Sequence, residues 1–292
     1  MIPERLALEW DAAYSAGQSV VLRYAPALLR GVLSREDLLA CSQKEGLRLL
    51  DLGTYRNVRL LLLDETSGMK TGTYKSLDGC IATAMCRKRG IRRVVFSSGS
   101  NTGMALTDYA GNAGMESFFF CPTGTLYKLD GKAFDRPGAH LIAVEGLDRR
   151  VKKAAGVFAE AIEAPVIPAL EWRLLSGACR GLFLAEQMLQ LNLSCSWFVQ
   201  AVCAGFGPIG LFGALDALAR AGHMAPSRIP RFMGVQQEPF PPWFAPGRGA
   251  KRRWGRPRPP GESSPSSLRS TIRTLTRPIR CFTKSCVAMA GI

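Results

Sequence analysis

The chain has 292 residues, of which 47% are hydrophobic and 21% charged, a composition typical of a soluble globular protein with one large or two medium domains. The first ten residues are charged and include no apolar run, so no signal peptide is predicted. Glycines and a proline interrupt the longest apolar stretch, residues 197–219, which excludes a membrane span. We therefore expect a cytoplasmic protein with no membrane partner.

The net charge of +15 is distributed unevenly. Residues 239–292 contain 11 Lys or Arg and one acidic residue, so this segment carries +10 of the total. It is also rich in Pro and Ser, which favours a disordered or aberrant tail after the folded part. Because the preceding residues carry only the remaining +5, nucleic acid is not expected as the main partner. The nine cysteines form no CxxC pair, and no metal site is predicted.

Two helices are predicted first, an amphipathic one over Glu4–Ser15 and a short one opened by the capping box Ser34–Asp37. Short β-rich runs then alternate with helical periods from Leu47 to Gln237. The predicted strands are 58–63, 93–97, 117–121, 140–144, 165–168, 197–202 and 232–237. The predicted helices are 75–88, 102–113, 126–134, 149–162, 177–191 and 209–221. This alternation predicts an α/β fold with parallel sheets covered by helices.

Lys75 lies at the predicted start of a helix, after a β-rich run and a Gly-containing loop. The positive end of the helix dipole disfavours a protonated lysine there. A neutral amine is what Schiff-base formation with an aldehyde requires. Position alone does not separate this residue from a solvated surface lysine.

Two further turns join a strand to a helix through small residues. The first turn follows the predicted strand 93–97 and has the sequence Phe96-Ser-Ser-Gly-Ser-Asn-Thr-Gly. It forms either a cradle for an anion or simply a capped turn. The second turn has the sequence Val199-Gln-Ala-Val-Cys-Ala-Gly-Phe-Gly-Pro-Ile-Gly210. Its glycines permit the backbone to approach a phosphate closely. A dinucleotide site competes with this reading, but the turn comes late in the chain and no acidic residue closes the next strand.

Together these motifs resemble those of the fold type II pyridoxal-phosphate enzymes, the threonine synthase and cysteine synthase type within the tryptophan synthase β-like superfamily. Thr71-Gly-Thr-Tyr-Lys75 resembles the lysine motif T-G-S-F-K, although Asp64 stands where Lys is usual and Glu65 comes one place early. The turn that begins at Phe96 resembles the asparagine loop of this family. Ser100 stands at the position before Asn101 where the family has a glycine. Residues 121–146 and 175–186 resemble two further blocks, and all five follow the family order.

The resemblance implies a cofactor site for pyridoxal 5'-phosphate with Lys75 as catalytic residue and Schiff-base partner. Asn101 would lie beside the cofactor ring, and the substrate carboxylate would bind Ser98, Ser100 and Thr102. The cofactor phosphate would be held by five residues, Gly205, Phe206, Gly207, Ile209 and Gly210, whereas Pro208 has no N–H to offer.

The fold implied is two three-layer parallel-sheet domains with the cofactor between them. Residues 1–86 and 164–238 would form the large domain, and residues 87–163 a small mobile domain with the asparagine loop. The activity implied is that of a lyase or synthase in amino-acid metabolism, acting by β- or γ-elimination or replacement, with a threonine synthase-like or cysteate synthase-like substrate. The family also implies a homodimer and a small-molecule amino-acid substrate.

One expected part of the site is missing from the sequence. Nothing after Gln237 matches the family segment that places a Ser, Thr or Cys against the pyridine nitrogen. A truncation or a frameshifted reading of the last segment would explain the change of composition. Two alternatives therefore stay open: an inactive cofactor-scaffold protein, and a protein that binds nucleic acid or an anionic surface through its basic tail.

Overall fold

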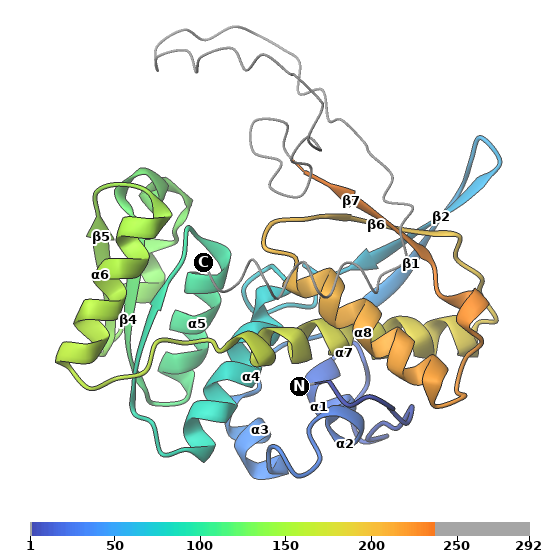
Figure 1. Cartoon of the computed structure of the whole chain (residues 1–292), viewed down its shortest axis with the longest axis horizontal. Coiled ribbons are helices and arrows are strands. Elements are labelled where there is room, and N and C mark those ends of the chain that lie inside the picture. Colours follow the sequence, from blue (N-terminus) through green and yellow to red (C-terminus); the bar gives the residue numbers. More distant parts are fainter. Residues whose placement is uncertain (1, 237–292) are drawn as a thin grey trace, which may run out of the picture. The chain divides into compact units, whose positions relative to one another are not determined.

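The structure is a computed structural model, and it describes residues 2–236 (Figure 1). Its internal contacts divide the chain into two compact units. Of the described residues, the first comprises 2–194 and 206–228, and the second comprises 195–205 and 229–236. The predicted basic tail, residues 239–292, lies outside the described residues. The predicted division into a large and a small domain stays a prediction.

Helices and strands alternate over most of the described chain. The α-helices are α1 (Val20–Arg23), α2 (Ala25–Leu28), α3 (Arg35–Cys41), α4 (Lys75–Lys88), α5 (Asn101–Asn112), α6 (Asp148–Ala161), α7 (Leu170–Gln190) and α8 (Phe206–Arg220). The strands are β1 (Arg48–Tyr55), β2 (Val58–Asp64), β3 (Arg93–Ser97), β4 (Glu116–Pro122), β5 (Ala139–Val144), β6 (Trp197–Ala201) and β7 (Arg231–Val235). Three short 3-10 helices are η1 (Thr123–Lys128), η2 (Gly131–Phe134) and η3 (Pro226–Arg228). The predicted α/β class is confirmed, and among residues 2–236 no helix has both the length and the apolar character that a bilayer span needs.

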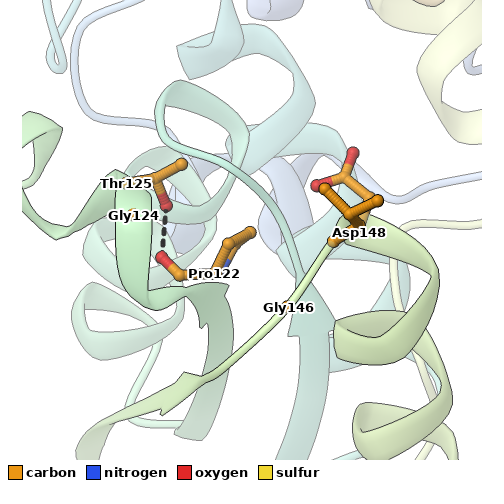
Figure 2. A pocket seen from close by; sticks show the side chains of 6 residues that line it. Pro122, Gly124, Thr125, Gly146 and Asp148 are labelled. Atoms are coloured by element: carbon orange, nitrogen blue, oxygen red, sulfur yellow. Dashed lines mark hydrogen bonds between the residues drawn. The ribbon is translucent and has the colours of Figure 1, made fainter. Parts of the chain in front are cut away.

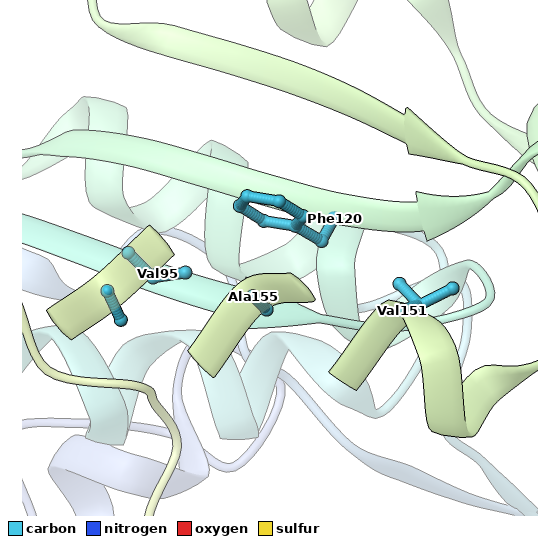
Figure 3. Close-up of a cluster of buried hydrophobic side chains, with 5 residues drawn as sticks. Val95, Phe120, Val151 and Ala155 are labelled. Carbon is cyan, nitrogen blue, oxygen red and sulfur yellow. The ribbon is translucent and has the colours of Figure 1, made fainter. Parts of the chain in front are cut away.

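Strands β3, β4 and β5 form a parallel sheet in that order, and helices cover both of its faces. On one face Val151 and Ala155 of α6 pack with Phe120 and Val95 in a buried apolar cluster (Figure 3). Neighbouring residues of a strand point to opposite faces, so Phe119 faces the other side. There its ring packs against α5 at Gly103, where an added Cβ would lie 2.1 Å from the ring.

The other two sheets have two strands each. β1 pairs antiparallel with β2 in the first unit, with Arg48 opposite Asp64. The sequence pattern indicated only β2, because β2 has the apolar run Leu60–Leu63, whereas Asp51 and Gly53 interrupt the apolar residues of β1. In the second unit β6 and β7 pair parallel, with Trp197 opposite Arg231, which confirms the two strands predicted there.

The amphipathic helix predicted over Glu4–Ser15 is wrong. The Leu6 amide donates to the carbonyl of Ala217, and the Asp11 amide donates to the carbonyl of Arg23. These donors are therefore used by tertiary partners and not by a helical ladder. The Asp11 side chain also accepts from the Ala13 amide at 3.0 Å, which favours a local turn.

Two later predictions also need correction. The helix expected over residues 126–134 is replaced by η1 and η2, because the Asp130 side chain accepts from the Lys132 amide and starts a new turn. The strand expected over Pro165–Pro168 is a single bridge to Val95. The prolines at both of its ends have no N–H to extend the ladder. In contrast, Ser34 caps α3 as its capping box predicted, with its hydroxyl accepting from the Asp37 amide.

A buried ion pair joins the N-terminal segment to α7. The Arg23 guanidinium contacts both carboxylate oxygens of Glu186, at 2.6 and 3.0 Å. The Tyr24 hydroxyl donates to the same carboxylate at 2.5 Å, and Gln190 donates at 2.9 Å. Burial by itself raises the pKa of Glu186, but the hydrogen bonds from Arg23 and Tyr24 outweigh it and lower that pKa.

This network predicts the pH dependence of stability. We expect Glu186→Gln to lower the free energy of unfolding by about 3 kcal/mol at pH 7, because it leaves Arg23 buried without its carboxylate. The folded pKa of Glu186 lies below the unfolded value, so the pair contributes fully above that value and is lost as the pH falls through the folded pKa. The difference in free energy of unfolding between wild type and variant should therefore decrease as the pH is lowered. Urea unfolding at each pH measures this difference.

The matched control is Glu160→Gln, which changes an exposed glutamate of α6. It should alter the free energy of unfolding by no more than about 0.5 kcal/mol. A gap between wild type and Glu186→Gln that stays constant down to pH 3 would contradict the assignment.

Candidate active site

Lys75 is the first residue of α4, as predicted, but it is not a solvated surface lysine. Its side chain is only 15% exposed. The Nζ atom lies 4.2 Å from the centre of the Tyr74 ring and 3.1 Å from Oδ2 of Asp78, one turn further along the helix. The Thr71 amide donates to the Ser76 hydroxyl at 3.1 Å and so ties the preceding loop to the helix start.

Asp78 links Lys75 to a second cation. Its side chain is 2% exposed, and Nε of Arg173, in the first turn of α7, lies 4.0 Å from its Oδ2 atom. The Arg173 guanidinium in turn stacks 4.2 Å from the ring centre of Phe206, the first residue of α8. A continuous series of contacts therefore runs from the start of α4 to the start of α8.

A second ion pair also contacts Tyr74. Nε of Arg180 is 2.5 Å from the Glu65 carboxylate, and the guanidinium is 4.8 Å from the Tyr74 ring centre. The Arg180 side chain is 1% exposed. Sequence reasoning missed this pair, although one signal was present: an arginine within an otherwise apolar stretch of α7.

The loop before Lys75 is fixed by Asp64. The Ser67 hydroxyl and amide hydrogen-bond to this carboxylate and hold the pKa of Asp64 well below its usual range, helped by the Thr66 amide and by Arg48. Asp64 therefore shapes the loop as a charged acceptor. Its contacts are local, and none of them involves Lys75.

The predicted asparagine loop joins β3 to α5. The Ser98 amide donates to the Phe120 carbonyl at 3.1 Å, and the Ser100 amide donates to the Ser98 hydroxyl at 3.3 Å. Ser100 has a φ of −175°, so it does not adopt the positive φ for which glycine is favoured. Asn101 is exposed as the first residue of α5, and Thr102 follows it, partly buried.

A pocket of about 460 Å³ opens beside this loop (Figure 2). It is lined by Pro122, Gly124, Thr125, Gly146, Leu147 and Asp148. Pro122 ends β4 and the others follow β4 or β5, at the carboxyl edge of the parallel sheet, where ligands bind in α/β folds. The asparagine loop follows β3 at the same edge, and a Cβ added to Gly99 would lie 3.9 Å from the Thr125 methyl. Lys75 does not line this pocket.

The predicted phosphate-binding residues are the first turn of a helix, not a loop followed by a helix. α8 begins at Phe206, three residues earlier than predicted, and includes Gly207, Ile209 and Gly210. The amides at the start of a helix, here those of Gly205, Phe206 and Gly207, have no partner within it and favour an anion. The amides of Ile209 and Gly210, four residues after Gly205 and Phe206, belong to the helical ladder, so this part of the prediction needs correction. Gly205, directly before the helix, has a φ of +84°, which suits glycine.

Glycine contacts determine where these helix starts lie. A Cβ on Gly79 of α4 would lie 3.0 Å from the carbonyl oxygen of Ala105 in α5. Each of these residues lies four positions after the first residue of its helix, so the first turns of α4 and α5 both lie close to this contact. A Cβ on Gly210 would lie 2.7 Å from Cα of Gly177 in α7, so α7 and α8 touch backbone to backbone.

Comparison with solved structures identifies the fold. Holo diaminopropionate ammonia lyase from Escherichia coli matches with a TM-score of 0.52 and 16% identity, over 70% of this chain and 60% of that one. The apo form of the lyase matches with a TM-score of 0.52 and 14% identity, over 80% and 69%. Pyridoxal-phosphate-bound threonine synthase from Brucella melitensis matches with a TM-score of 0.53 and 15% identity, over 74% and 52%.

No protein-family model matches the sequence, and no curated protein does. The chain spans about 60% of the length of the holo lyase. The structural matches confirm the resemblance on which the sequence reasoning rests: the chain has the fold of pyridoxal-phosphate-dependent lyases and synthases.

The contact between α7 and α8 gives a test by substitution. We expect Gly210→Ala to lower the free energy of unfolding by about 1–3 kcal/mol, because its methyl group would meet the Leu174 carbonyl at 2.3 Å and the start of α8 must shift. Thermal and urea unfolding measure the change.

Gly156→Ala is the control, because an added Cβ there meets nothing within 4 Å on helix α6. It should be neutral or stabilise the protein by about 0.5–1 kcal/mol. Equal effects of the two substitutions would show that the close approach of α7 and α8 does not constrain the fold.

Proposed function

We propose that the protein binds pyridoxal 5'-phosphate through Lys75 and acts on an amino acid as a lyase or synthase, by β- or γ-elimination or replacement. The observation that carries the proposal is the position of Lys75. Its amine is mostly buried at the start of α4, and contacts through Asp78 and Arg173 connect it to the first turn of α8. An amine and a helix N-terminus so connected suit a ligand with an aldehyde and a phosphate.

The residues present fit this cofactor. The amides of Phe206 and Gly207 would hold the phosphate, with the Gly205 amide before them, whereas those of Ile209 and Gly210 lie where the helical ladder of α8 begins. Gly207 and Gly210 are buried and present only backbone. Lys75 would bind the aldehyde and then move the substrate α-proton as general base and acid. The cofactor supplies an electron sink for the negative charge that this proton transfer leaves on the substrate.

The asparagine loop would receive the substrate. Its hydroxyl-bearing residues, Ser98, Ser100 and Thr102, lie in a turn that leads into a helix N-terminus, which suits the α-carboxylate. Asn101 would lie beside the cofactor ring. The pocket at the adjacent sheet edge provides room next to this loop for a substrate side chain.

The structural neighbours favour the general class and leave the reaction open. One is an ammonia lyase and another a threonine synthase. We propose a small amino acid with a hydroxyl, phosphate or acyl leaving group as substrate, with a threonine synthase-like reaction preferred, and a homodimer in the cytoplasm. The main alternative is a scaffold that binds the cofactor without turnover.

The test of cofactor binding is covalent trapping. Purified protein incubated with pyridoxal phosphate and reduced with borohydride should gain one phosphopyridoxyl group, and peptide mass mapping should place it on Lys75. A visible absorption band should appear before reduction. Lys75→Ala should lose both signals, because no other amine in the site can form the imine.

Lys70→Ala is the matched control, since Lys70 is an exposed lysine of the same loop. It should keep the band and the adduct. A wild-type protein that stays colourless and unlabelled with excess cofactor would overturn the proposal. Labelling of Lys75 without conversion of any amino acid that has a hydroxyl, phosphate or acyl leaving group would favour the inactive scaffold.

A further inference from the structure

The Asp78 carboxylate has an unusual environment. Its side chain is 2% exposed, and its Oδ2 atom has no hydrogen-bond partner of adequate geometry among residues 2–236. Two cations face it, Lys75 at 3.1 Å and Arg173 at 4.0 Å. Nε of Arg173 is likewise buried without a hydrogen bond in the described part of the chain. A buried carboxylate requires a compensating cation, so one of the two must always remain beside it.

We infer that Asp78 is a positioning residue that holds Lys75 while no cofactor is bound, and that Arg173 replaces Lys75 as its ion-pair partner when the cofactor binds. This inference rests on the proposed function. It concerns residues in which this sequence departs from the lysine motif that it resembles, because Ser76-Leu-Asp-Gly replaces the usual D-R-G.

The geometry requires such an exchange. To react, Nζ of Lys75 forms a bond to the aldehyde carbon, and the aldehyde oxygen leaves as water with two of the ammonium protons. The imine keeps the third proton and the positive charge. Because the Asp78 carboxylate is 2% exposed, no ring can be placed beside it. The nitrogen must therefore turn toward the exposed side of its own chain and leave Asp78.

Arg173 is placed to compensate the carboxylate after that movement. It already lies 4.0 Å from Oδ2, beyond an optimal ion-pair contact, and a small shift would bring it to hydrogen-bond distance. The other charged groups nearby are not available for this exchange. Arg180 already contacts Glu65 at 2.5 Å and lies 4.8 Å from the Tyr74 ring centre.

The experiment measures labelling of Lys75 by borohydride trapping as a function of pyridoxal phosphate concentration. Asp78→Asn should bind cofactor about tenfold more tightly, because no ion pair has to be broken. Arg173→Gln should bind about tenfold more weakly, because Asp78 is then left uncompensated when Lys75 departs. In the double variant the Arg173 substitution should have no effect, since Arg173 acts only through Asp78.

A direct contact between Arg173 and the cofactor phosphate is the competing explanation. In that case Arg173→Gln would weaken binding equally with and without Asp78→Asn, and this result would overturn the inference. Pyridoxal, which has no phosphate, gives an independent check. The weakening by Arg173→Gln should persist with pyridoxal under the inference and disappear under the competing explanation.

Two further variants keep the test decisive. Arg173→Lys retains the cation and should bind cofactor within about threefold of wild type. Circular dichroism and thermal unfolding establish whether each variant is folded. If Asp78→Asn is not folded, the same measurements are made with Asp78→Ser. Unlabelled wild type would defeat the proposed function itself. Labelled wild type with unchanged Asp78 and Arg173 variants would defeat only this inference.

Discussion

The close approach of helices at glycine positions is the constraint on which the candidate site depends. At Gly79 a side chain would meet the Tyr109 ring at 2.6 Å, and at Gly177 it would meet Cα of Gly210 at 2.8 Å. Gly79 and Gly210 lie one turn inside their helices, so these contacts determine where the N-termini of α4 and α8 lie. A helix N-terminus that is fixed by packing is a preorganised set of amide donors. The position of the Lys75 amine follows from the same packing, because this residue begins α4.

The charged side chains of the site follow from this packing. Once α4 and α7 are in contact, Asp78 cannot reach water, and the sequence provides Lys75 and Arg173 as its partners. Arg180 of the same α7 helix is buried with Glu65 in a comparable way. Buried ion pairs add little to net stability, but removing one partner is costly. The two ion pairs therefore serve mainly to orient the groups around the Lys75 amine. The proposed replacement of Lys75 by Arg173 as the partner of Asp78 would depend on this orientation.

Much of the fold could be predicted from the sequence, and the misses have physical reasons. The bounds of α4 and β3 were predicted to the residue, since the Gly-containing loop before α4 and the apolar run of β3 give strong patterns. β1 was missed because its exposed residues show no alternation. α7 begins seven residues before the predicted start at Gly177, without a capping side chain, so Arg173 was not recognised as helical. Its contact with Asp78 depends on tertiary packing, which no local pattern reports.

The balance of charge in the site argues for an anionic ligand. Lys75, Arg173 and Arg180 face two carboxylates, the buried Asp78 and the partly buried Glu65. The unpartnered amides of the first turn of α8 add further positive potential beside Phe206. Two carboxylates do not neutralise three cations and a helix N-terminus, and a phosphate ester supplies the missing negative charge. In the proposed complex the phosphate of the cofactor would therefore compensate the site as a whole, while its aldehyde would bond to the Lys75 amine.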